Sequence, residues 1–200
     1  MPVDEFRERM STEPSADQAD EALVAALIEL ERHIGERGWD QPPRLFALVR
    51  TDDVIAAEPE LVDRLGLRGS AQGAPEDALT AIEQDHFQGT GDILADLEPI
   101  VWPDPVFGCA MALERTFLPS SAEPELPEDP TAAAEFVSQH PERQDVRVVV
   151  GADRAGHSHG VARLVSRPED LLAAPDLVPG LGAALAHTLK HDDPEVEERQ

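Results

Sequence analysis

The sequence predicts an α+β fold in which an N-terminal and a C-terminal helix pack on a mainly antiparallel sheet of about four or five strands. Apolar residues recur at helical spacing near both ends of the chain, which predicts the two helices. Between them lie several apolar runs, two of which are joined by a short turn containing glycine, which predicts the sheet. Because strands and helices do not alternate regularly, we expect the helices to cover one face of this sheet.

The N-terminal helix is the most strongly indicated element. Ser15 and Gln18 have the spacing of a capping box, and Gly38 is placed to end the helix as its C′ residue. The apolar stripe between them consists of Leu23, Leu27, Leu30 and Ile34. The C-terminal helix has a similar stripe made of Leu177, Leu181, Leu185 and Leu189. Both stripes predict a helix that buries one side against the sheet.

Four segments have the apolar character of strands, namely residues 44–51, 106–118, 146–152 and 159–166. Small and large side chains alternate in the second segment, which predicts one small-residue face and one large-residue face. The large-residue face is expected to carry Phe107, Cys109, Met111 and Leu113. In the hairpin formed by the last two segments, Arg147 and Arg163 mark the side expected to face solvent.

The segments between the strands predict short helices. One or two helices, interrupted near Pro59, are expected between residues 52 and 73. Residues 75–77 resemble a helix start, because proline stands at the first position and acids follow in the first turn. The buried stripe of this helix would be Leu79, Ile82 and Phe87. Further short helices are expected at residues 92–97 and 131–139.

Length and composition indicate one domain with charged ends. The 200 residues are 41% apolar, which is enough for a substantial core. We expect residues 1–14 to form a disordered leader, residues 15–191 a single α+β domain, and residues 192–200 an acidic tail. The start of the chain lacks the apolar segment of a signal peptide, and a single cysteine cannot form an intrachain disulfide. A cytoplasmic location is therefore expected.

Acidic residues dominate the charge of the chain. There are 41 Asp and Glu against 16 Lys and Arg, which gives a net charge of −25, and Lys190 is the only lysine. A surface this negative repels phosphates and anionic lipid headgroups, so the charge argues against nucleic-acid and membrane partners. Much of the acid lies in the leader, in the proline-rich segment 119–130 and in the tail, so the charge excludes partners without identifying one.

Four histidines are the candidate metal ligands, namely His157, His159, His187 and His191. Histidines two apart on a strand project to the same face and can share a metal, and Asp153 lies near enough in sequence to be a third ligand. The other two are spaced i, i+4 and so share one face of the C-terminal helix. Two other interpretations are open: exposed histidines in a glycine-flanked turn, and polar residues that interact with a helix C-terminus.

No residue pattern indicates a catalytic or cofactor site. Cys109 lies in the middle of a strand, where a free cysteine is typically a buried apolar residue, and no nucleophile motif joins it to His86. The glycine pairs at residues 89–91 and 180–182 lack the remainder of a phosphate-binding fingerprint. We therefore expect neither a catalytic residue nor a cofactor.

Three segments carry a resemblance to a known family, namely PVFGCAMALERTFLP, DVRVVVGADRAGHSHGVARLV and DLVPGLGAALAHTL. Over residues 17–190 the chain resembles a family of actinobacterial proteins of similar length with no assigned activity. This resemblance implies an actinobacterial, cytoplasmic protein and supplies no catalytic residues. In element order the chain is also similar to the secretion-chaperone fold, in which small acidic proteins form dimers that hold an extended segment of another protein.

The leading hypothesis is a non-enzymatic cytoplasmic protein that binds another polypeptide as a chaperone or adaptor. The hypothesis depends on the acidity, on the lack of a coherent catalytic pattern and on small-residue faces that permit close association. Its chaperone version predicts a homodimer. The alternative is a metal-binding protein or metal-dependent enzyme that uses the four candidate histidines.

Overall fold

A computed structural model describes residues 16–117, 127, 129–174 and 177–190. Six strands form one antiparallel sheet in the order β2-β1-β3-β4-β5-β6. The strands are β1 (Arg44–Arg50), β2 (Leu79–Glu83), β3 (Val106–Phe117), β4 (Gln144–Asp153), β5 (Ser158–Leu164) and β6 (Arg167–Ala174). The α-helices are α2 (Ala16–Gly35), α3 (Thr51–Ala57), α4 (Pro59–Leu65), α5 (Ile93–Leu97), α6 (Pro130–Gln139) and α7 (Leu181–Thr188). The predicted α+β class is confirmed, with six strands in place of about four or five.

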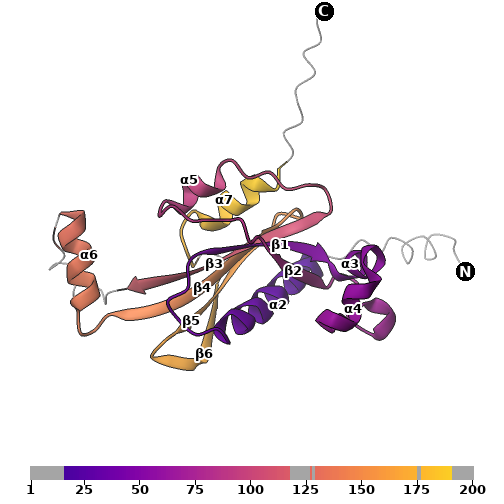
Figure 1. Ribbon diagram of the computed structural model, residues 1–200, viewed down its shortest axis with the longest axis horizontal. Helices are drawn as coiled ribbons and strands as arrows, with labels where there is room; N and C mark the ends of the chain where they lie inside the picture. The colour runs from indigo at the N-terminus through magenta and orange to yellow at the C-terminus, as the bar shows by residue number, and fades with distance from the viewer. Residues whose placement is uncertain (1–15, 118–126, 128, 175–176, 191–200) are drawn as a thin grey trace, which may run out of the picture.

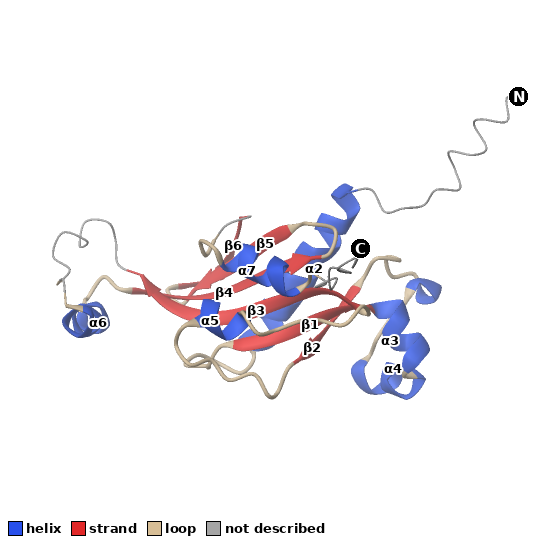
Figure 2. Ribbon diagram, turned by 90° about the horizontal axis from the view of Figure 1, so that it is seen from above, coloured by secondary structure: helices blue, strands red, loops and turns tan. Residues whose placement is uncertain are grey.

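The sheet lies between two layers of helix (Figures 1 and 2). One face is covered by α2, and the other is covered by α7 with α5 beside it. The expectation that helices cover only one face is therefore wrong. The physical reason lies in β3 and β4, which carry apolar side chains on both faces, so that both faces have to be shielded from water.

The stripe predicted on the N-terminal helix forms the core on the α2 face. This core joins Leu23, Leu27, Leu30 and Ile34 of the helix to Phe46, Leu48, Ala110, Ala112, Val149 and Val161 of the sheet. The helix approaches β4 closely at Gly151, where an added Cβ would lie 2.7 Å from Leu27 Cδ2 and 3.2 Å from the Cys109 carbonyl oxygen. The absence of a side chain at Gly151 is what allows this approach.

The core on the α7 face confirms the C-terminal helix, although the helix spans Leu181–Thr188, so that Leu177 precedes it and Leu189 is its C-cap. Its members include Leu181, Leu185 and Leu189 together with Cys109, Met111, Leu113, Val148 and Val150 of the sheet. Trp102 joins this core from the segment before β3. Its indole Nε1 donates to Thr188 Oγ1 over 2.9 Å, and its backbone N–H donates to the Thr188 carbonyl over 3.2 Å.

Both edge strands differ from the sequence prediction. Residues 79–83 form β2 and pair with β1, so the helix predicted to begin at residues 75–77 is wrong. Pairing with β1 satisfies the backbone of this segment and buries Leu79 on the α2 face, which outweighs the local helix signals. At the other edge, β6 matches no predicted segment, because the proline and charges of Arg167–Asp170 are untypical of a strand.

A β-bulge changes the predicted faces of β3. Gly108 and Val106 pair with successive residues of β1, so Phe107 between them is the extra residue. Phe107 consequently packs on the α2 side, which corrects its predicted place on the large-residue face. The other members of that face lie together in the α7 core as predicted, namely Cys109, Met111 and Leu113.

The remaining helices agree with the prediction. α3 and α4 are separated just before Pro59, and α5 begins behind Asp92, whose Oδ1 accepts the Ala95 N–H over 3.2 Å. α6 lies away from the other helices, near the C-terminal end of β3 and the N-terminal end of β4 (Figure 1). The predicted leader, the acidic tail and most of the 119–130 segment lie outside the described residues. None of the helices in the described part of the chain is long and apolar enough to cross a bilayer.

Candidate functional site

The edge strand β2 presents backbone groups that the sheet does not use. Just beyond β2, the Gln84 N–H donates to the Leu45 carbonyl over 2.9 Å. The backbone N–H and C=O groups of Gln84, and of every second residue before it, therefore point toward β1. Because backbone groups alternate in direction along an antiparallel strand, those of Leu79, Ala81 and Glu83 point away from β1. β2 ends the sheet order, so no strand of the described chain pairs with these groups.

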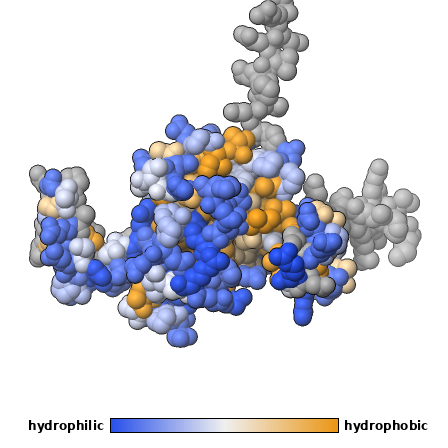
Figure 3. All heavy atoms as spheres, viewed as in Figure 1, coloured by the Kyte–Doolittle hydropathy of each residue, from blue (hydrophilic) through white to orange (hydrophobic). Residues whose placement is uncertain are grey.

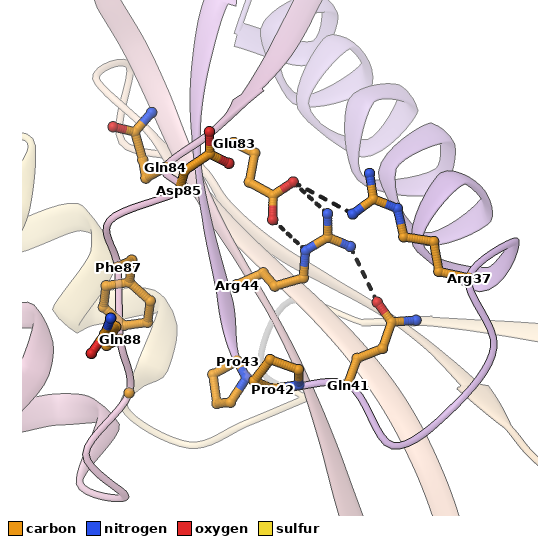
Figure 4. Close-up of a pocket in the computed structure, with 11 residues that line it drawn as sticks. Arg37, Gln41, Pro42, Pro43, Arg44, Glu83, Gln84, Asp85, Phe87 and Gln88 are labelled. Carbon is orange, nitrogen blue, oxygen red and sulfur yellow. Dashed lines mark hydrogen bonds and ion pairs between the residues drawn. The ribbon is translucent and has the colours of Figure 1, made fainter.

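A hollow of about 450 Å³ lies at the C-terminal end of β2 (Figure 4). At its centre the Arg44 guanidinium donates to both oxygens of the Glu83 carboxylate, through Nε over 2.5 Å and through Nη2. Arg37 Nη1 lies 3.8 Å from the same carboxylate, and Arg44 Nη1 donates to Gln41 Oε1 over 3.2 Å. Two cations of this hollow are therefore held by one carboxylate.

The ion pair between Arg44 and Glu83 predicts a specific dependence of stability on pH. Hydrogen bonding from the guanidinium lowers the pKa of Glu83 below its ordinary value of 4.5. The pair therefore contributes stability that is fully present above pH 4.5 and is lost as the pH falls through the lower folded-state pKa.

We expect wild-type protein to lose up to about 1 kcal/mol more stability than Glu83→Gln when acidified from about pH 6 to about pH 3. Urea unfolding followed by circular dichroism at both pH values measures this difference. Equal losses in the two proteins would contradict the assigned role of Glu83.

A second hollow, of about 670 Å³, lies on the α5 side of the 84–88 segment, and we call it the apolar groove. Its apolar lining consists of Leu45, Phe87, Ala95, Pro99, Ile100, Val101, Trp102 and Pro103. Val101 is 66% exposed, and Ile82, which faces the same side of the sheet from β2, is 43% exposed. Figure 3 shows apolar side chains gathered on this upper side of the molecule, with hydrophilic residues around them.

A buried cluster of charges joins α2 to β4 and β5. Glu31 has no exposed surface; its Oε2 lies 2.8 Å from Arg163 Nη2 and its Oε1 lies 3.7 Å from Arg147 Nη1. Arg147 is 2% exposed, and its Nη2 donates to Glu114 Oε1 over 3.0 Å. The Arg147 guanidinium carbon also lies 4.3 Å from the centroid of the Trp39 ring. These contacts hold the helix layer to the sheet from within the core.

The buried cluster corrects the prediction that Arg147 and Arg163 face solvent. Both arginines lie on the α2 face of the sheet, where Glu31 supplies the compensating negative charge. With Glu31 and Arg147 removed from water, a ligand in solution has no route to the centre of the cluster. The arrangement is therefore structural, and the accessible surfaces lie elsewhere on the molecule.

The structure describes three of the four candidate metal ligands. His157 Nδ1 lies 2.9 Å from Asp153 Oδ2, while His159 pairs with Gly151 on the α2 face. His187 belongs to α7, which packs on the opposite face of the sheet. The fourth, His191, lies outside the described residues. Within the described ranges no three His, Cys, Asp or Glu side chains form a group able to hold a metal, so the four-histidine site stays a prediction.

Cys109 is a buried apolar residue, as predicted. Its Sγ lies 3.5 Å from the Leu185 carbonyl oxygen and 3.6 Å from Thr188 Oγ1. Burial raises the pKa of the Cys109 thiol to about 12, so the thiol is neutral at ordinary pH and is not a nucleophile. His86 lies apart from it, at the exposed border of the apolar groove.

Neither the apolar groove nor the open edge of β2 was predicted from the sequence. The helix predicted from residue 75 onward is the reason, because that prediction places Ile82 and Phe87 in a buried helical stripe and leaves no strand edge or groove there. A signal was nevertheless present in the charges: residues 76–104 contain eight Asp and Glu and no Lys or Arg. A local bias of this kind, in a segment that also carries exposed apolar residues, is typical of a surface that binds a partner.

Comparison with known proteins places the chain in a family. Residues 23–190 match the PPA1309-like protein family, so the chain belongs to that family. No curated protein and no solved structure matches the chain. The resemblance to a family is thereby confirmed, and the likeness to secretion chaperones gains no support from solved structures.

Proposed function

We propose that this member of the PPA1309-like protein family is a non-enzymatic protein that binds another polypeptide, in the manner of an adaptor or chaperone. The proposed site is the apolar groove together with the adjoining edge of β2. The observation that carries the proposal is the position of the groove, an open apolar hollow of about 670 Å³ beside a strand edge.

Exposed apolar side chains support a partner on this side of the molecule. Val101 is 66% exposed, Leu94 of α5 is 50% exposed and Ile82 of β2 is 43% exposed. Covering such surface contributes about 25 cal/mol per Å² of apolar area removed from water. Gln84, Gln88 and other polar residues border the groove, and an apolar centre with a polar rim is the usual composition of a protein-binding surface.

The edge of β2 supports a partner that is a polypeptide. An extended chain can add to a sheet edge as a further strand, because its backbone can form hydrogen bonds with the N–H and C=O groups that point outward. In β2 these groups belong to Leu79, Ala81 and Glu83. Affinity would come from the backbone bonds, and specificity would come from side chains that enter the neighbouring hollows.

The homodimer predicted from the sequence remains a separate proposal, which light scattering of the purified protein tests. Two copies joined through β2 would bring the acidic 76–104 segments together, at a cost in electrostatic repulsion. A homodimer would therefore use a different surface from the one proposed for the partner polypeptide.

Selection of peptides from a random library of about 12 residues, displayed on phage, tests the proposal. We expect selected peptides to bind wild-type protein at least about tenfold more tightly than Val101→Glu, which places a charge in the apolar groove. Val165→Glu is the matched control, because Val165 is also exposed and lies at the β5–β6 turn. Peptides that bind all three proteins equally, or a selection without binders, would contradict the proposed function.

A further inference from the structure

We infer that the polypeptide bound at β2 is an extended segment in which apolar and basic residues alternate. The inference rests on the proposed function and adds the chemistry of the partner. Its basis is the difference between the two sides of β2, because a strand added to this edge would send alternate side chains to opposite faces of the sheet.

The two edges of the sheet differ in how they admit a further strand. At one edge, β6 contains Arg167, Pro168, Glu169 and Asp170. Proline and charged residues of this kind discourage pairing with another chain. At the other edge, β2 has the sequence LTAIE, which contains no proline and a single charged residue, already paired with Arg44. The edge of β2 is therefore the one suited to a partner.

The face of β2 toward α5 is apolar. Ile82 points to this side, since it pairs with Ala47 of the α7-face core, and the apolar groove continues the same surface past Gln84. Side chains of an added strand that point to this side would lie against Ile82 and the groove. Burial of apolar side chains is favourable there, so we assign the apolar residues of the partner to this face.

The opposite face of β2 borders a hollow that combines acidic residues with apolar ones such as Ala22, Ala25 and Leu79. A space of about 390 Å³ lies between α2 and the start of β2, and its charged lining consists of Glu21, Glu29 and Asp77. Glu21 and Glu29 are exposed, and neither forms an ion pair with a residue in the described ranges. Among the described residues no Lys or Arg lines this hollow, although Arg50 Nη1 donates to the Asp77 carbonyl over 2.8 Å. We assign the basic residues of the partner to this face, because opposite charges attract across it.

The distribution of charge along the chain also favours a basic partner at β2. Residues 76–104, which form β2, one side of the groove and α5, contain eight acids and no Lys or Arg. The cations nearest to this segment in the hollow of Figure 4 are Arg37 and Arg44, and both lie against Glu83. Arg50 also contacts this segment, through the Asp77 carbonyl, but the eight acids outnumber these cations. A basic segment would therefore be attracted to this edge, and its association would weaken with added salt.

Fluorescence anisotropy with labelled synthetic peptides of about eight residues tests the inference. The probes are alternating Lys-Val, Ser-Val and Lys-Ser peptides, together with a Lys-Val peptide whose backbone is N-methylated at alternate residues. We expect Lys-Val to bind at least about tenfold more tightly than each of the other three, because only Lys-Val has the apolar side chains, the charges and the backbone donors. The affinity should fall when salt is raised from about 0.05 M to about 0.5 M.

The double variant Glu21→Gln with Glu29→Gln locates the basic side of the partner. We expect it to weaken binding of the Lys-Val peptide by about fivefold or more and to leave the Ser-Val affinity unchanged. Glu58→Gln with Glu60→Gln makes the same change in net charge at exposed positions beside α3 and α4 and serves as the control. Equal effects of the two double variants would show attraction to net charge alone and would overturn the inference.

Three further outcomes distinguish this inference from the proposed function. If Ser-Val binds as tightly as Lys-Val, and Val101→Glu weakens both, the proposed function stands and the alternating basic partner is wrong. If the N-methylated peptide binds as tightly as its parent, strand addition is wrong. If none of the peptides binds while library peptides still distinguish Val101→Glu from wild type, the inference fails and the groove remains a polypeptide site.

Discussion

Glu31→Ala is expected to lower the free energy of unfolding by about 3 to 5 kcal/mol. The substitution removes the carboxylate that Arg147 and Arg163 share in the buried cluster. Arg147 is only 2% exposed, so its guanidinium would remain in the interior with less compensating charge. A buried charge without its partner is far less stable than either an intact pair or an apolar replacement.

Urea unfolding at neutral pH measures the effect, and two variants serve as controls. Glu29→Ala removes an exposed carboxylate from the same helix and should change stability by less than about 1 kcal/mol. Replacing the cluster as a whole, by Glu31→Leu with Arg147→Met and Arg163→Leu, should give a more stable protein than Glu31→Ala alone. If Glu31→Ala and Glu29→Ala cost the same, the cluster does not hold α2 to the sheet.

Leu27→Ala is expected to lower the free energy of unfolding by about 2 to 5 kcal/mol. Leu27 has no exposed surface and lies at the centre of the α2 core. Truncation leaves a cavity whose lining loses its van der Waals contacts. The adjacent Ile28 is 41% exposed, and Ile28→Ala should cost less than about 1 kcal/mol by the same urea measurement.

A second substitution, Gly151→Ala, tests whether Leu27 stabilises the protein through the close approach of α2 to β4. In wild-type protein Gly151→Ala should cost about 1 to 3 kcal/mol, because the new methyl group would lie 2.7 Å from Leu27 Cδ2. In the Leu27→Ala background the same change should cost less, since the obstructing atom is absent. Additive effects in this double-mutant cycle would contradict the packing of Leu27 over Gly151.

The parts of the fold that depend on local pattern could be predicted from the sequence. The stripe of Leu23, Leu27, Leu30 and Ile34 sufficed for α2, and the runs of small and large residues sufficed for β3, β4 and β5. β2 could not be predicted in this way. Its five residues carry a proline and acids just before them, and their strand conformation depends on pairing with β1, about 30 residues earlier in the chain.

The candidate site depends still more on tertiary structure. An arginine that faces solvent and an arginine that faces a buried acid produce the same alternating pattern in a strand. The buried position of Arg163 could not be recognised from that pattern, because its partner Glu31 lies 132 residues away in the sequence. The groove likewise combines Leu45 of β1 with residues 84–103, and only the fold places them together. The uninterrupted apolar run of β4 was one available sign that both faces of the sheet are covered.

The buried cluster also decides how α2 is aligned along the sheet. Arg147 and Arg163 stand directly opposite each other in the β4–β5 pair, an arrangement of like charges that is unfavourable alone. The leucine stripe of α2 repeats almost every turn, so a helix shifted by one turn, about 5.4 Å, would still bury apolar side chains. That shift would bring Leu27 or Gly35 over the two arginines in place of Glu31. A single acid in an otherwise repetitive stripe therefore selects one alignment among several that hydrophobic contact alone would accept.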